Sequence, residues 1–180
     1  LLVANAANNA IWGQYPQSQS ADEYGEWRGW FIDGPRAGEP LAGGDWPVAR
    51  VLAGREHDAG VFEIEPFDIQ GLRRTVLVRA ALLRDANGEI TGAVAAHMDI
   101  TPQVAAEKAL KESEGRFRAI ANVIPQMVWS THVATSVTYL NERWQEFTGV
   151  PTAELARGAW YDAVHPDDRP GLDTRWEHSR

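Results

Sequence analysis

The pattern that decides the fold occurs twice in this chain, as LVANAANNAIWG at residues 2–13 and as TYLNERWQEFTG at residues 138–149. In each copy a short apolar stretch ends on Asn, and Gly follows eight positions later. An Asn side chain can cap the start of a helix, and Gly can adopt the positive φ that closes one. The sequence therefore predicts a strand, two helical turns and a stop, twice over, and hence a repeated domain.

The composition narrows the range of functions. The 180 residues carry a net charge of −8 without clustered Lys and Arg, so neither nucleic acid nor an anionic membrane is an expected partner. Cysteine is absent, which excludes disulfides, Cys-ligated metals, thiol nucleophiles and chromophores attached through a thioether. The sequence shows no signal peptide and no run of transmembrane length, and we expect a cytoplasmic segment.

The first half continues with a helix and a set of strands. A short helix is predicted over 46–53, with Asp45 as N-cap and Gly54 as its stop. Three antiparallel strands are predicted after it, over residues 61–65, 73–83 and 89–100. On the last of these, His97 and Asp99 share one face because side chains alternate along a strand.

The second half begins with a longer helix. It is predicted over 102–121, with Thr101 as N-cap, and Pro125 ends it. Apolar positions recur along it at alternating four- and three-residue steps, as in a seam that packs on another helix: Ala106, Leu110, Ser113, Phe117, Ile120 and Ile124. Two strands (127–130 and 137–140), the second Asn-to-Gly helix and a final helix capped by Asp167 are predicted to follow.

Together these features resemble the PAS family of sensor domains. In the first half the resemblance rests on Asn5, Gly13, the strand 73–83, the turn Asn87-Gly88 and Asp99-Ile100-Thr101, which is similar to the Asp-x-Thr that ends many PAS domains. In the second half it rests on Glu114-Gly115-Arg116-Phe117-Arg118, Ile124-Pro125, Trp129-Ser130, Tyr139-Leu140-Asn141, Gly149 and the run from Val164 to Arg169.

The resemblance implies an α+β fold: a PAS-like antiparallel five-stranded sheet with short flanking helices, in two incomplete copies joined by a long helix. Residues 1–101 would form a first PAS domain without its first strand, and residues 102–121 a signalling helix. Residues 122–180 would form a second PAS domain without its last strands. We hypothesise that the strand near Val128, or its copy in another chain, pairs with the strand over 89–100.

The same resemblance implies a sensory and relay segment of a bacterial signal-transduction protein. Its PAS domains would bind a small ligand or a partner, and the helix would pass the change to an effector outside these residues. That effector is most often a histidine kinase of a two-component system, and less often a diguanylate cyclase. The alternative is a protein-interaction and dimerisation module without a small-molecule ligand. We expect a homodimer through the PAS surfaces and the helix, and no enzymatic activity, because no catalytic motif is present.

Candidate ligand residues come from the first half. Trp12, Trp30, Trp46 and Phe62 could line a pocket for a planar ligand together with Asn5 and His97, or the aromatic residues could simply fill the core. In haem-binding relatives the ligating His lies on the helix before the three strands, and residues 46–53 contain none, so the sequence does not favour haem. A non-covalent flavin or another small molecule stays open, whereas the missing cysteine excludes a LOV-type photocycle.

The remaining candidates concern the relay and metal binding. Asp99 and Thr101 would tie the long helix to the last strand, and Leu110 and Phe117 lie on its seam. His165 has aspartates nearby, but no second His lies at ligand spacing, so we interpret the group as helix caps and predict no metal site.

Overall fold

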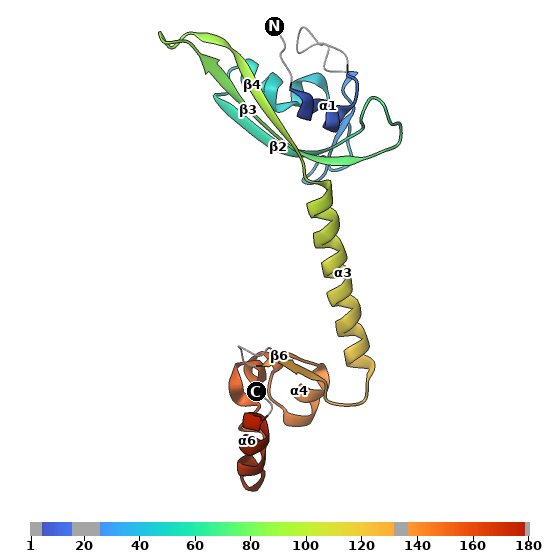
Figure 1. The fold of residues 1–180 in the computed structure, drawn as a ribbon, viewed down its shortest axis with the longest axis vertical. Helices are drawn as coiled ribbons and strands as arrows, with labels where there is room; N and C mark the ends of the chain where they lie inside the picture. The colour runs from blue at the N-terminus through green and yellow to red at the C-terminus, as the bar shows by residue number, and fades with distance from the viewer. Residues whose placement is uncertain (1–4, 16–25, 132–136, 179–180) are drawn as a thin grey trace. The chain divides into compact units, whose positions relative to one another are not determined.

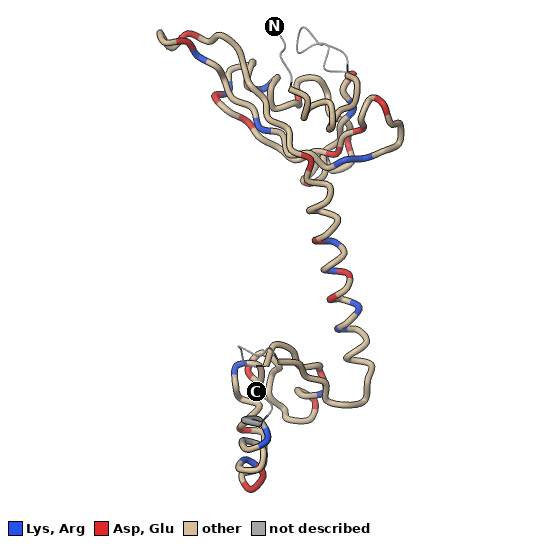
Figure 2. Tube along the Cα trace, viewed as in Figure 1, with Lys and Arg blue, Asp and Glu red and all other residues tan. Residues whose placement is uncertain are grey.

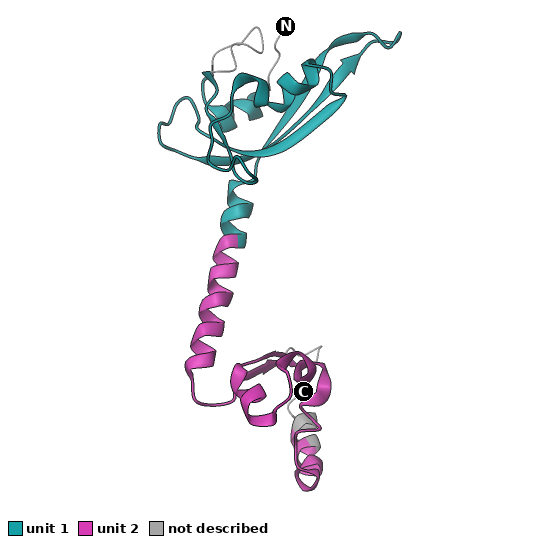
Figure 3. Cartoon of the chain, turned by 180° about the vertical axis from the view of Figure 1, so that it is seen from behind, with its two compact units in different colours: residues 1–107 teal, residues 108–180 magenta. Residues whose placement is uncertain are grey.

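The chain is described by a computed structural model for residues 5–15, 26–131 and 137–178 (Figure 1). It divides into two compact units, Leu1–Glu107 and Lys108–Arg180, which are considered separately below (Figure 3). Within those three ranges, no helix combines the length and the apolarity that a membrane span needs.

The first unit is built on a four-stranded antiparallel sheet with its strands in sequence order. The strands are β1 (Gly29–Phe31), β2 (His57–Ile64), β3 (Arg74–Arg84) and β4 (Ile90–Asp99). Val78 lies opposite Gly60 of β2 and opposite His97 of β4. The turn between β3 and β4 is held by Asp85, whose Oδ1 accepts from the backbone N–H groups of Asn87 and Glu89, both at 2.9 Å.

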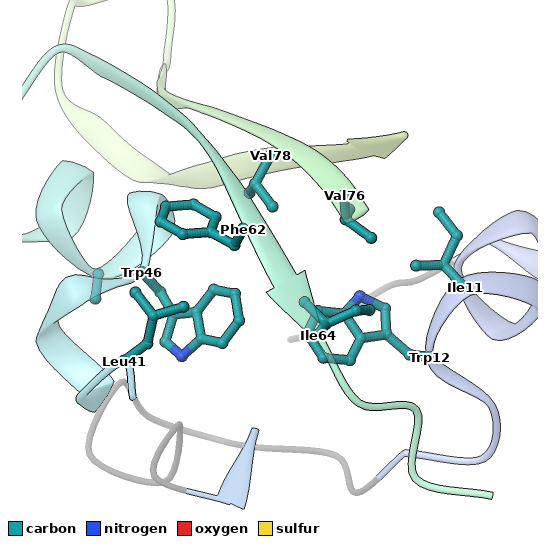
Figure 4. Packing of buried hydrophobic residues seen from close by; sticks show 9 residues of the cluster. Ile11, Trp12, Leu41, Trp46, Phe62, Ile64, Val76 and Val78 are labelled. Atoms are coloured by element: carbon teal, nitrogen blue, oxygen red, sulfur yellow. The ribbon is translucent and has the colours of Figure 1, made fainter. Parts of the chain in front are cut away.

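Short helices cover one face of this sheet: α1 (Ala6–Trp12), the 3₁₀ turn η2 (Gly43–Asp45) and α2 (Pro47–Leu52) (Figure 1). The Arg74 guanidinium of β3 donates to the carbonyls of Ala10 and Ile11, which fastens the last turn of α1 to the sheet. The core between the layers is apolar and closely packed, and Figure 4 shows Trp12, Trp46, Phe62 and their neighbours. Each such side chain contributes about 1.5–3 kcal/mol when fully buried.

The structure confirms most of the elements predicted here. The three antiparallel strands are present, with bounds shifted by up to four residues. The short strand β1 was not predicted, and the predicted opening strand, residues 2–4, lies outside the described residues. The N-cap of α2 is Trp46 rather than Asp45, because Asp45 closes η2 instead, accepting from the Ala42 N–H at 2.9 Å.

The predicted long helix is α3 (Thr101–Val123), a continuous helix of 23 residues. It starts one residue before and ends two residues after the predicted range, and Pro125 follows two residues after its end. Both acidic and basic residues lie along its middle part (Figure 2). Its apolar positions are largely exposed, with Leu110 at 62% and Ile120 at 65%.

The second unit contains a two-stranded antiparallel sheet and several short helices. The strands are β5 (Trp129–Thr131) and β6 (Val137–Leu140). The helical elements are α4 (Glu142–Thr148), α5 (Thr152–Glu154), the π-helical turn η3 (Leu155–Ala159), the 3₁₀ turn η4 (Pro166–Asp168) and α6 (Arg169–His178). Val137, Leu140 and Leu155 form its buried core, with Trp144 and Trp160 packed against them.

Two expectations for this half require correction, while the pairing of the Val128 region with the strand over 89–100 stays a prediction. Within the described residues, β5 pairs with β6 and β4 pairs with β3. The cap before the final helix is His165 rather than Asp167, since the His165 Nδ1 accepts from the Asp167 N–H at 3.4 Å. Asn141 stands at the N-cap position of α4, but its side chain makes no capping hydrogen bond.

The architecture is therefore α+β, with an antiparallel sheet and several helices. The described residues hold a four-stranded and a two-stranded sheet, so the five strands expected from the family resemblance are not seen together in either unit.

Candidate functional site

Three of the six candidate ligand residues meet in the core of the first unit. Trp12 is fully buried, and its ring centroid lies 5.6 Å from that of Trp46 at an interplanar angle of 67°. Trp46 in turn packs edge-on against Phe62, with centroids 5.7 Å apart (Figure 4). Such edge-to-face arrangements are the favoured geometry of buried aromatic pairs. The three rings fill space against one another, as the core-filling interpretation expects.

His97 joins this cluster from β4. The Trp12 Nε1–H donates to the His97 Nδ1 at 2.9 Å, and the Asn8 Oδ1 lies 2.9 Å from the same nitrogen. Burial lowers the pKa of His97 to about 4, so the imidazole is neutral near pH 7. A neutral imidazole carries one ring proton, so Nδ1 can serve only one of these two partners at a time. The His97 Nδ1 is thereby committed to a hydrogen bond inside the protein.

Asn5 and Trp30 lie apart from that cluster. Asn5 is exposed and caps α1, with its Oδ1 accepting from the Asn8 N–H at 3.1 Å. Trp30 points to the opposite face of β1 from Gly29 and Phe31, and the Arg73 guanidinium carbon lies 3.2 Å from the centroid of its ring. That stacking is a cation–π contact on the outer side of the sheet.

Trp46 carries an unmatched donor. Its indole is 5% exposed, and its Nε1 has no hydrogen-bond partner among the described residues. A buried donor without an acceptor costs about 1–3 kcal/mol, so most such groups in folded proteins are paired. An acceptor atom supplied from outside the protein would satisfy it.

Two of the predicted relay residues, Asp99 and Thr101, hold the start of α3 against the sheet through hydrogen bonds. The Thr101 Oγ1 accepts from the Thr75 N–H of β3 at 2.8 Å, and the Ile100 N–H donates to the Thr75 carbonyl at 2.9 Å. Asp99 holds the turn into the helix, with its Oδ1 accepting from the Thr101 N–H at 2.9 Å. Thr101 therefore bonds to a neighbouring strand rather than capping its own helix.

The other two relay candidates differ from each other. Leu110 is exposed on the middle of α3. Phe117, 50% exposed, packs edge-on against Tyr139 of β6, with ring centroids 5.0 Å apart at 62°. Phe117 therefore packs on β6 within the second unit, whereas Leu110 is not part of that unit's buried core.

A cavity in the second unit was missed by the sequence reasoning. It has a volume of about 160 Å³ and is lined entirely by apolar or aromatic side chains, contributed by both strands and by helical segments: Trp129, Val137, Leu140, Trp144, Trp160, Val164 and Leu172. The cavity is not enclosed, since Trp129 is 47% exposed, but its volume is close to that of apolar cavities that accept benzene-sized molecules. The three indoles lie at least fifteen residues apart in sequence, so no local pattern indicates that they converge.

The His and Asp residues near position 165 were considered as metal ligands. Among residues 5–15, 26–131 and 137–178, no group of three or more His, Asp or Glu side chains could hold a metal ion. His165 and Asp167 lie 3.6 Å apart on the exposed surface, where His165 also caps η4.

Comparison with known proteins locates a family in the second unit. Residues 137–180 match the model of the PAS fold family. The chain is 40% identical over 95 residues to the protein y4lL of Sinorhizobium fredii, an alignment that covers 53% of this chain and 12% of that protein. It is 26% identical over 102 residues to the peroxide stress-activated histidine kinase mak1 of Schizosaccharomyces pombe, covering 53% of this chain and 6% of that kinase. The chain thus spans only a small part of either relative.

Proposed function

We propose that this chain, whose residues 137–180 belong to a PAS domain, is a sensory and relay segment of a signalling protein. A small ligand or a protein partner is bound by PAS-like units, and the change passes along α3 to an effector outside these residues. We propose residues 1–101 as a second, related PAS unit, supported by the shared Asn-to-Gly helix and by the Asp99–Thr101 turn. The segment itself is non-catalytic and cytoplasmic in this proposal.

The observation that carries the relay is the way in which α3 leaves the sheet. The Thr101 Oγ1 accepts from the Thr75 N–H of β3, and the Asp99 Oδ1 at the end of β4 accepts from the Thr101 N–H. A shift of the sheet therefore moves the start of the helix with it. A continuous 23-residue helix behaves as a rigid element, which makes it suited to passing on a small rotation or translation. A histidine kinase is the effector we propose first, since one relative carries that name; a diguanylate cyclase is the alternative.

Two features support small-ligand binding. The unpaired Trp46 N–H would donate to an acceptor atom of a ligand, and the apolar cavity lined by Trp129, Trp144 and Trp160 fits a single aromatic ring. The cavity is the stronger candidate, because its volume is present without any rearrangement, while the aromatic rings of the first unit pack against each other.

Binding is tested by adding toluene to the purified 180-residue chain and following tryptophan fluorescence and thermal unfolding. Saturable binding that raises the unfolding temperature is expected, and it should disappear in Leu140→Trp, which fills the cavity. Trp30→Phe serves as the matched control, since it changes an indole of the other unit that lies against Arg73 on the outer side of the sheet. An unchanged unfolding temperature at saturating toluene would argue against the cavity as a ligand site. Mass spectrometry of the denatured protein identifies any molecule that copurifies.

The alternative, a dimerisation module without a ligand, is supported by exposed apolar side chains. Val94 and Met98 are each at least half exposed on the outer face of β4, Ile90 is 55% exposed at its start, and Leu110 is exposed on α3. Sedimentation at increasing concentration tests it: association that Met98→Glu or Leu110→Glu abolishes would favour this function, and it would leave the toluene result unaffected.

A further inference from the structure

Asn141 occupies an unusual place at the start of α4. It is 1% exposed, and all the hydrogen-bonding capacity of its side-chain nitrogen is used. The Nδ2 donates to the Ala121 carbonyl at 2.7 Å and to the Gln126 carbonyl at 2.9 Å, while the Oδ1 accepts from the Val128 N–H at 2.9 Å. One amide therefore joins the last turn of α3, the loop after it and the approach to β5.

The Ala121 carbonyl requires such a partner. In an α-helix the carbonyl of Ala121 would accept from the N–H of residue 125, and that residue is Pro125, which has none. Ala121 is 3% exposed, so water does not readily replace the missing donor. The neighbouring bond survives, because the Ile124 N–H still donates to the Ile120 carbonyl at 3.3 Å. The Asn141 amide thus supplies the hydrogen bond that Pro125 removes.

Further contacts hold the same turn against β6 and α4. The Asn122 Oδ1 accepts from the Glu142 N–H at 3.1 Å, next to the Asn141 contact. One turn earlier, the Phe117 ring packs on Tyr139. These contacts, together with the Asn141 bonds, fix the helix end in rotation as well as along its axis.

We propose that Asn141 is the positioning residue that couples the end of α3 to the strands and helices of the second unit; this rests on the relay function proposed above. If the last turn of α3 moved without β6, the Asn141 Nδ2 and the Ala121 carbonyl would lose their hydrogen bond in a buried site. The displacement is therefore passed to β5 and α4 rather than lost by fraying of the helix. Pro125 and Asn141 act as a pair. Pro125 removes the backbone hydrogen bond to the Ala121 carbonyl, and the Asn141 amide replaces it.

Hydrogen exchange of the complete 180-residue chain, measured without ligand, tests this coupling. In Asn141→Ala, the amides of Val128 and of Ile120–Val123 should exchange about tenfold faster or more, since their shared anchor is lost. Asn5→Ala is the matched control: it removes the equivalent residue of the first copy, and exchange at these amides should stay unchanged. Equal protection of Val128 in Asn141→Ala and in the parent chain would overturn the proposal.

Rescue separates positioning from simple packing. In the double variant Asn141→Ala, Pro125→Ala, the restored N–H at residue 125 can donate to the Ala121 carbonyl. The amides of Ile120–Val123 should then regain their protection from exchange, while the Val128 amide still exchanges fast. Loss of packing alone would not be rescued by a change at residue 125, and that outcome would refute the role.

If Asn141→Ala does not fold, hydrogen exchange of the parent chain tests the coupling instead. The Val128 amide and the amides of the last turn of α3 should then open together, with exchange rates that agree within about threefold across temperature, because one clamp holds both. Widely different rates would contradict the proposal. Because no ligand is present, a failed toluene experiment leaves this result standing, and a failed exchange experiment leaves the ligand proposal standing.

Discussion

The two Asn-to-Gly helices have the same length and the same flanking residues, but their asparagines serve different purposes. Asn5 is exposed and caps its own helix, α1. Asn141 is buried and leaves α4 without a side-chain cap, because its amide bonds to the end of α3 and to the segment before β5. A local pattern can thus specify a helix twice and leave the role of its first residue to the tertiary surroundings. Four predictions test how far the two copies differ.

The largest difference is expected when each asparagine is replaced by aspartate. Asn141→Asp puts a carboxylate oxygen against the carbonyls of Ala121 and Gln126 in a buried site, which should destabilise the second unit by about 4 kcal/mol. Asn5→Asp should change stability by less than about 0.5 kcal/mol, because Asp and Asn are equally good N-caps. Urea denaturation with exchange detection in each unit measures both. Equal effects would show that the two positions are equivalent.

The second prediction concerns acid, which should weaken the first unit. Burial lowers the pKa of His97 from its ordinary 6.5 to about 4, so the unfolded chain binds the proton more tightly than the folded one. Stability should therefore fall as the pH falls from about 6.5 to 4, by about 3 kcal/mol over the full window. In His97→Gln this loss should disappear, whereas in His165→Gln, an exposed position, it should remain. A parent chain with the same pH dependence as His97→Gln would contradict the assignment.

The third prediction compares the two closing glycines. Gly13 has φ 74° and ψ −151°, and a Cβ added there would meet the Asp68 carboxylate at less than van der Waals distance. Gly149 has φ 72° and ψ 2°, with open space around the added atom. Gly13→Ala should cost about 2 kcal/mol, from backbone strain and crowding together, and Gly149→Ala about 1 kcal/mol from strain alone. Thermal unfolding of both variants measures the difference. A larger loss at Gly149 would reverse the ranking.

The smallest effect is expected at the start of α3. Thr101→Val preserves the shape of the side chain but removes the acceptor of the Thr75 N–H, which should cost about 1 kcal/mol in the first unit. Thr91→Val is the control, since the Thr91 hydroxyl donates to the Leu83 carbonyl at an exposed site and should contribute little. Exchange of the Thr75 amide follows the change directly. No acceleration in Thr101→Val would mean that another group holds this helix end.

Much of the fold could be predicted from the sequence, because local signals agreed with the tertiary structure. The run from residue 74 to 84 alternates in burial as a half-covered strand should, and the Asn-to-Gly spacing placed α1 and α4 within a residue. β1 escaped prediction because three residues are too few to show a period. His165 caps the 3₁₀ turn η4 by accepting from the Asp167 N–H, so the helical run begins before the residue that was predicted as its cap.

The candidate site was harder to predict, because it depends on residues that are distant in sequence. The aromatic residues Trp12, Trp46 and Phe62 were predicted to lie together and do, in a packed cluster. Trp30 belongs to the same set by composition, but the alternation of β1 turns it to the other face, toward Arg73. The buried Asn141 bonds to the Ala121 carbonyl, for which Pro125, sixteen positions before Asn141, has no N–H, and no sequence pattern links the two residues.

The strand β4 has a consequence for handling the protein. From Ile90 to Met98 it contains no Lys, Arg, Asp, Glu or Pro, and within the described residues only β3 pairs with it. Charged residues, prolines and bulges are what usually keep such an edge from templating a further strand. Protein concentration is therefore a variable in every solution experiment on this chain, and dilution series belong beside each measurement of its stability.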